Sequence, residues 1–86
     1  MTRKVVWTHH ARQFLLHGIQ RPDKRAAILD AVGLLSDFPE AFPVARSRRF
    51  PGHRAITLVH PFVVLYRADA TLVTVVAVFA GRRRSA

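Results

Sequence analysis

Two kinds of hydrophobic spacing divide the chain, and the first half has the spacing of helices. A run of β-branched and aromatic residues at 4–7 predicts a short strand. Apolar residues then recur at helical spacing from Ala11 to Gly18, with Thr8 as the predicted N-cap and Gly18 as the predicted end. A second helix is expected from position 22 or 23 until Pro39 ends it. The apolar stripe predicted for this helix is Ala27, Ile28, Ala31, Val32, Leu34, Leu35 and Phe38.

From position 53 onward the apolar period changes to two, which is the spacing of strands. Segments 53–60, 62–67 and 71–80 are predicted strands, and Arg54, Ile56, Leu58 and His60 would share one face of the first. Short turns between these segments predict an antiparallel meander, and residues 39–52 before it are expected to form a loop. The last strand is apolar on both faces, which indicates an interior position. The chain is therefore predicted to be α+β, with order β-α-α-β-β-β and a helical hairpin packed on a small antiparallel sheet.

Length and composition predict a single domain over residues 1–86 that folds without disulfides. A chain of 86 residues supports one hydrophobic core, and it contains no cysteine. The N-terminal segment lacks the apolar core of a signal peptide. The longest apolar run, 72–80, is shorter than the roughly 20 residues of a membrane-spanning helix. We therefore expect a cytoplasmic protein with no membrane partner.

The excess of positive charge in the sequence points to an anionic partner. Lys and Arg number 14 against 5 Asp and Glu, giving a formal net charge of +9. The window 41–68 contains five arginines and no acidic residue, so the basic surface belongs to the C-terminal half. Such a balance favours binding to nucleic acid or to an acidic protein.

The residue types present exclude several kinds of chemistry and leave one candidate. The histidine spacings do not suit a metal ion, and no glycine-rich phosphate loop or cofactor motif is present, so we expect neither metal nor cofactor. Histidine, arginine and tyrosine would suit RNA phosphodiester cleavage, in which arginines stabilise the negative charge of the transition state. The alternative is that the arginines are ordinary outward-facing residues and that 82–84 is a solubilising tail. The residues of this constellation, on or beside the meander strands, are His53, Arg54, His60, Tyr66, Arg67, Arg82 and Arg83.

Five segments that follow one another along the chain carry a family resemblance. They are "VVWTHHA" at 5–11, "LLSDFP" at 34–39, "HRAITL" at 53–58, "PFVVLYRAD" at 61–69 and "VVAVFAGRRR" at 75–84. Together they resemble the RelE/ParE superfamily of toxins from type II toxin–antitoxin systems. The resemblance implies the α+β fold described above and a cognate acidic antitoxin that covers apolar and basic surface of the toxin.

The superfamily has two kinds of target, and the resemblance favours the ParE-like kind. RelE-like members cleave mRNA on the ribosome, whereas ParE-like members inhibit DNA gyrase without catalysis. Arg54 and Arg83 match basic positions of the family. However, Val63 stands where nuclease members carry an arginine, and no tyrosine or histidine follows Arg84. "WT" at 7–8 and "DFP" at 37–39 are ParE-like, while the short helical hairpin is closer to RelE.

The favoured function is therefore a gyrase-binding toxin, with an mRNA endonuclease as the alternative and an inactive toxin-fold binding protein as a third possibility. Candidate catalytic residues, if the chain is a nuclease, are His53, Arg54, His60, Tyr66 and Arg83. Candidate residues for binding the target or the antitoxin are Arg48, Arg49, Arg54, Arg67, Arg82, Arg83 and Arg84.

Overall fold

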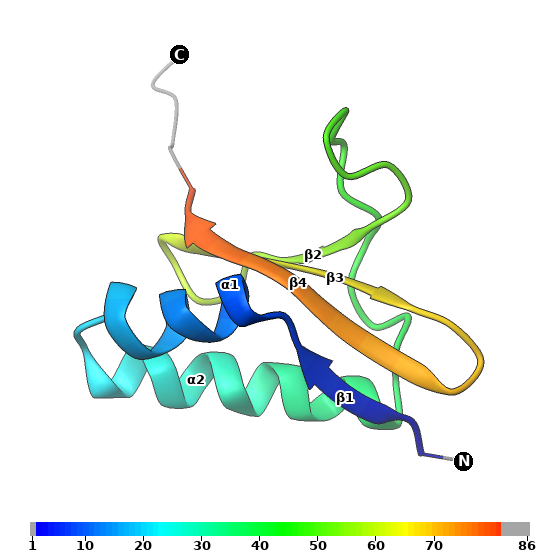
Figure 1. Ribbon diagram of the computed structural model, residues 1–86, viewed down its shortest axis with the longest axis horizontal. Helices are drawn as coiled ribbons and strands as arrows, with labels where there is room; N and C mark the ends of the chain where they lie inside the picture. The colour runs from blue at the N-terminus through cyan, green and yellow to red at the C-terminus, as the bar shows by residue number, and fades with distance from the viewer. Residues whose placement is uncertain (1, 82–86) are drawn as a thin grey trace.

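The computed structural model describes residues 2–81, which form two helices and four strands (Figure 1). Helix α1 continues without a break into a π-helical segment, η1, and α2 continues into a 3₁₀ turn, η2. The elements in chain order are β1 (Lys4–Trp7), α1 (His9–Gln13), η1 (Phe14–Gly18), α2 (Pro22–Gly33), η2 (Leu34–Ser36), β2 (Arg54–Ile56), β3 (Phe62–Ala68) and β4 (Leu72–Ala80).

The four strands form one sheet in the order β1-β4-β3-β2. Strands β2, β3 and β4 form the predicted antiparallel meander, and β4 lies in the interior as predicted. The sheet is mixed rather than antiparallel throughout, because β1 runs parallel to β4. Backbone bonds fix this register at both ends, from Lys4 N to Thr71 O (3.3 Å) and from Thr8 N to Val75 O (3.0 Å). With β1 along one side and β3 along the other, β4 has a hydrogen-bonded partner strand on both sides, as expected of an interior strand.

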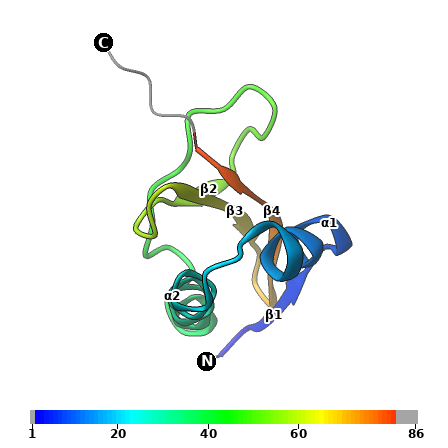
Figure 2. The same cartoon turned by 90° about the vertical axis from the view of Figure 1, so that its left-hand side faces the viewer.

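The helices pack on one face of the sheet, which confirms the predicted α+β class. Figure 2 shows α2 beneath the sheet and α1 next to β4. Thr8 caps α1 as predicted: its hydroxyl oxygen accepts a bond from Ala11 N (3.2 Å) and donates to Val76 O (2.8 Å), which ties the helix start to β4. Pro22 is the first residue of α2, where its missing N–H costs nothing.

The second helix ends earlier than its apolar stripe predicts. The chain tightens into η2 after Gly33, so the side chains that follow no longer keep the helical face. Leu35 is fully buried, but Leu34 is 52% exposed and Phe38 63% exposed. The assignment of Leu34 and Phe38 to the core is therefore wrong.

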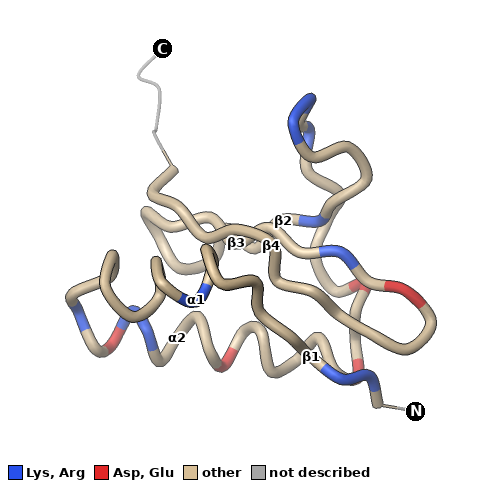
Figure 3. The backbone as a smooth tube through the Cα atoms, viewed as in Figure 1, with Lys and Arg blue, Asp and Glu red and all other residues tan. Residues whose placement is uncertain are grey.

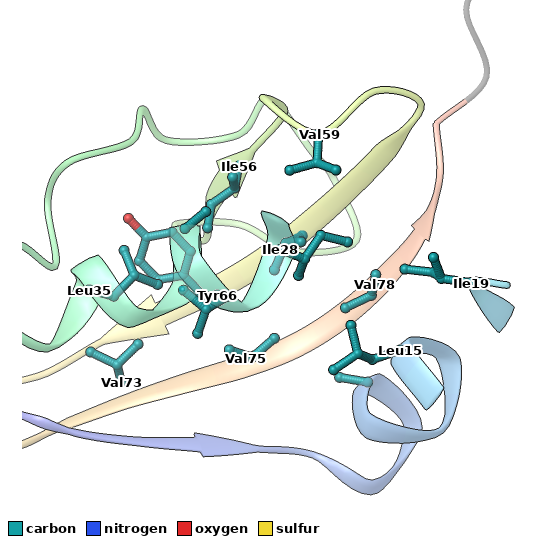
Figure 4. Close-up of a cluster of buried hydrophobic side chains, with 14 residues drawn as sticks. Leu15, Ile19, Ile28, Leu35, Ile56, Val59, Tyr66, Val73, Val75 and Val78 are labelled. Atoms are coloured by element: carbon teal, nitrogen blue, oxygen red, sulfur yellow. The ribbon is translucent and has the colours of Figure 1, made fainter. Parts of the chain in front are cut away.

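The core lies between the helices and the sheet (Figure 4). The helical segments contribute aliphatic side chains, and the sheet contributes a row of valines together with the ring of Tyr66. The labelled members are Leu15, Ile19, Ile28, Leu35, Ile56, Val59, Tyr66, Val73, Val75 and Val78.

The strand predicted over 53–60 is also shorter than its alternation suggests. β2 ends at Ile56 and the chain turns, with Phe62 N donating to Val59 O (2.8 Å). Val59 consequently enters the core, whereas Leu58 is 71% exposed and His60 is exposed. The predicted common face of Arg54, Ile56, Leu58 and His60 therefore does not form.

Candidate functional site

The face of the sheet opposite the core carries a groove, which we call the sheet groove. Its floor consists of the residues of β2, β3 and β4 that alternate with the core, and its volume is about 680 Å³. The loop between α2 and β2 lines it together with His10 at the start of α1. The lining residues are His10, Ala45, Arg46, Ser47, Arg49, Phe50, Ala55, Val63, Leu65, Val76, Ala77 and Phe79.

The loop beside the groove is held in place by backbone bonds. It pairs with the start of β2 through Ala45 N to His53 O (2.7 Å) and Ala55 N to Pro43 O (3.0 Å). Gly52 has φ +79°, a left-handed conformation that favours glycine. The loop rises on the side of the sheet away from α2 (Figures 1 and 2), and lysine and arginine positions cluster at its outer end (Figure 3). The sequence of the loop therefore presents Arg46, Arg48 and Arg49 as a basic rim, which includes two of the predicted binding residues.

Tyr66, a predicted catalytic residue, is built into the core. Its side chain is fully buried, and its hydroxyl donates to Pro39 O (2.8 Å). Burial raises the pKa of Tyr66 above its ordinary value, while the backbone of Phe42 and the charge of Arg54 oppose that rise. The hydroxyl therefore fastens the connection after α2 to the sheet.

Arg54 lies beside Tyr66, because the two residues are partners in the β2–β3 register. Its Nη1 donates to Phe42 O (2.8 Å), so the guanidinium is also tied to the loop. The histidines lie elsewhere: His53 precedes β2, with Nδ1 3.2 Å from Pro51 O, and His60 lies in the turn beyond the strand. The structure thus brings Arg54 and Tyr66 together and places His53 and His60 outside opposite ends of β2.

A second hollow lies at the end of β3, and two of the predicted residues, Arg54 and Arg67, line it. Its volume is about 290 Å³, and Arg3, Arg54 and Arg67 line it; we call it the arginine cavity. Arg3 reaches it because its Nε donates to Asp69 O (2.8 Å). The predicted residues Arg82, Arg83 and Arg84 lie outside the described residues.

Sequence reasoning missed Arg3, His10, Arg46 and Phe50. Arg46 belongs to the basic window and could have been included on charge alone. His10 and Arg3 reach their sites through the pairing of β1 and α1 with β4, for which the local sequence carries no signal. The topology of the sheet therefore determines which basic side chains line each hollow.

Metal-binding and membrane-spanning features were also sought in the part of the chain that the structure describes. Within residues 2–81, no group of three or more His, Asp or Glu side chains could hold a metal ion. No helix in the same range is both long and apolar enough to cross a bilayer.

Comparison with solved structures finds toxin–antitoxin complexes. A chain of the toxin–antitoxin complex RelBE2 from Mycobacterium tuberculosis is 28% identical, with a TM-score of 0.75 over 93% of this chain and 92% of that chain. A chain of the chromosomal ParDE TA system from P. aeruginosa shares the fold at 20% identity, with a TM-score of 0.70 over 94% of this chain and 98% of that one. No protein-family model matches the sequence, and no curated protein does so. The comparisons confirm the fold expected from the resemblance.

Proposed function

We propose that this chain, whose fold is that of the RelE/ParE superfamily of toxins, is the toxin component of a type II toxin–antitoxin module. The observation that carries the proposal is the near full-length match to chains of two toxin–antitoxin complexes. A net charge of +9 on 86 residues adds a reason for an anionic partner. The partner we propose is a cognate acidic antitoxin.

The sheet groove is the surface we assign to that antitoxin. Its floor is apolar, with Val63, Leu65 and Phe79 among the lining residues, and Arg46 and Arg49 stand at its side. A peptide that alternates apolar and acidic side chains would bury the first kind on the floor and pair the second with the arginines. Phe79, which is 39% exposed in the free chain, would become covered.

For the target, we propose inhibition of DNA gyrase by binding, which is the ParE-like mode. This proposal rests on the arrangement of the candidate catalytic groups within residues 2–81. General acid–base catalysis needs a proton carrier within hydrogen-bond reach of the reacting atom. The hydroxyl of Tyr66 is buried and bonded to Pro39, and His53 and His60 lie beyond opposite ends of β2. Binding makes no such demand, since it requires only a complementary surface.

A ribosome-dependent mRNA endonuclease remains the second candidate function. The observation that favours it is the higher identity to the RelBE2 chain, 28% against 20% for the ParDE chain. In that case Arg54 and Arg83 would stabilise charge on the scissile phosphate. A toxin fold that retains only antitoxin binding is the third.

Two assays on the purified chain separate these functions. The first measures supercoiling by gyrase, and the second measures cleavage of mRNA on programmed ribosomes. We expect loss of supercoiling and intact mRNA, and we expect addition of the proposed cognate antitoxin to restore supercoiling. Cleavage that Arg54→Ala or Arg83→Ala abolishes, but that the exposed-surface control Arg12→Ala retains, would instead establish the endonuclease. Antitoxin binding with neither activity would leave the binding protein.

A further inference from the structure

We propose that two copies of this chain associate through the outer side of the helical hairpin, with α1 and η1 of each copy packed on α2 of the other. The inference goes beyond the proposed function, because neither antitoxin binding nor gyrase binding requires a dimer. The helices cover the face of the sheet opposite the sheet groove, so a dimer of this kind leaves the groove open in both copies.

Both helical segments of the hairpin expose apolar side chains. Leu16 of η1 is 51% exposed, and Leu29 of α2 is 49% exposed. Ala26 and Gly33 are also exposed, and their spacing of three and four residues from Leu29 places all three on one side of α2. A Cβ atom at Gly33 would meet nothing within 4 Å, so no other part of the described chain covers this side of the helix. Small residues beside a leucine allow a second helix to approach closely.

The two segments of the hairpin differ in charge. Positions 1–22 contain arginine, lysine and histidine but no acidic residue, whereas positions 26–45 contain Asp30, Asp37 and Glu40 but no lysine or arginine. The acidic positions follow α2 and the connection after it (Figure 3). Asp30 and Asp37 are exposed, and neither forms an ion pair within residues 2–81. The outer side of the hairpin is therefore basic along its first segment and acidic along its second.

This charge distribution favours one of two symmetric arrangements. A two-fold axis in the contact plane and perpendicular to the helices would place α2 on α2, so that the exposed acids of both copies would lie close together. An axis parallel to the helices, between the two segments, instead places the basic segment of each copy on the acidic α2 of the other. Opposite charges then meet twice, once on each side of the axis.

The same charges disfavour other occupants of this surface. Asp30 and Asp37 would repel an acidic peptide or a nucleic acid, and the first segment of the hairpin would repel a basic peptide. A partner that matches both segments must be apolar, with one basic and one acidic strip. The outer side of a second copy has this composition.

The contact is small, so we expect a weak and reversible dimer. Helix α2 has 12 residues and is therefore about 18 Å long. A contact made by two such segments from each copy lies near the lower limit of specific interfaces, about 1,200 Å² in total. The expected Kd is on the order of tens of micromolar.

Sedimentation velocity of the full chain over a wide concentration range tests the dimer. We expect the sedimentation coefficient to rise with concentration. Leu16→Ser and Leu29→Ser should each weaken the dimer by about tenfold or more, because each substitution removes two apolar contacts from the symmetric pair. Asp30→Lys should weaken it by a similar factor, because the charge is reversed at both contacts.

The matched control is Leu58→Ser, which removes a leucine that is 71% exposed in the turn between β2 and β3. It should leave the dimer unchanged. A monomer at every concentration up to about ten times the expected Kd would overturn the proposal. Equal weakening by Leu29→Ser and Leu58→Ser would contradict it too, because it would mean association through exposed leucines in general.

Disulfide cross-linking tests the arrangement independently of these variants. The chain contains no cysteine, so introduced thiols report only the designed contact. An oxidised mixture of Leu16→Cys and Leu29→Cys should yield a cross-linked pair of the two variants, and each variant alone should yield little. Efficient cross-linking of Leu29→Cys to itself would place α2 on α2 and refute the arrangement. Neither experiment involves gyrase, ribosomes or antitoxin, so failure of the dimer is distinguishable from failure of the proposed function.

Discussion

Replacing Tyr66 with phenylalanine tests whether this residue stabilises the fold or takes part in catalysis. The substitution keeps the buried ring and removes the hydroxyl that donates to Pro39 O (2.8 Å). Loss of one such bond costs about 0.5–1.5 kcal/mol of unfolding free energy. For a domain of this size, that corresponds to a drop in melting temperature of roughly 2–12 °C. Any toxicity should survive the change, because the hydroxyl is buried and bonded to the backbone of Pro39.

The pH dependence of stability provides an independent measurement on the same side chain. Burial raises the pKa of Tyr66 above 10.0, so the folded state holds the phenolic proton more tightly than the unfolded state. This contribution to stability is fully present below pH 10 and is lost as pH rises through the folded pKa. The wild type should therefore lose stability in this range, and Tyr66→Phe should lack that component of the loss.

The assay combines thermal unfolding with ultraviolet absorbance. Because Tyr66 is the one tyrosine in the chain, phenolate absorbance reports its titration without interference from others. Unchanged melting of Tyr66→Phe, or titration of Tyr66 at or below the ordinary tyrosine pKa, would refute the assigned packing role. Loss of mRNA cleavage by a variant of unchanged stability would show that the hydroxyl acts in catalysis.

Three further predictions concern the helices and the β3–β4 turn. Leu35→Ala should destabilise the protein by about 2–5 kcal/mol in chemical denaturation, because a fully buried side chain leaves a cavity; a smaller loss would mean that the core relaxes around it. Thr8→Ala should cost about 1–2 kcal/mol through the lost cap and the lost bond to Val76 O, whereas Thr8→Ser should retain most of both. Bonds from the Thr71 and Leu72 backbone lower the pKa of Asp69, so the stability it provides is present above about pH 4 and is lost as pH falls through the lowered value. Acid unfolding should accordingly be less steep in Asp69→Asn, and an identical pH profile would contradict this role.

Local signals in the sequence were enough to predict most of the elements. The cap at Thr8, the proline at position 22 and the alternation along β3 and β4 each reflect the conformation of a few adjacent residues. Where the prediction was wrong, a tertiary contact outweighed the local pattern. Val59 enters the core by turning the chain, so the alternation after Ile56 does not continue as a strand.

The strand that pairs with β1 could not be predicted from the local sequence. Trp7 and Val75 are paired across almost the whole chain, and a parallel pair carries no turn signal that would link them. The candidate site depends on the same topology. Residue type alone was enough to predict Arg54, Tyr66 and Arg67 as candidates. That Arg3 lines one cavity with Arg54 and Arg67, and that the Tyr66 ring is buried, follows from how segments distant in sequence pack together.

The interior position of β4 has a consequence for the time at which the protein becomes active. Strand β4, which lies between β1 and β3 in the sheet, is the last of the four strands to be translated. Until residues 72–80 have left the ribosome, β1 has no strand to pair with, and the β2–β3 hairpin is of a kind that is marginally stable in water. A nascent chain, or a fragment released before residue 72, therefore lacks the native sheet and both hollows built on it. Synthesis itself therefore sets the earliest time at which the folded surface can meet a partner, because translation must first pass β4.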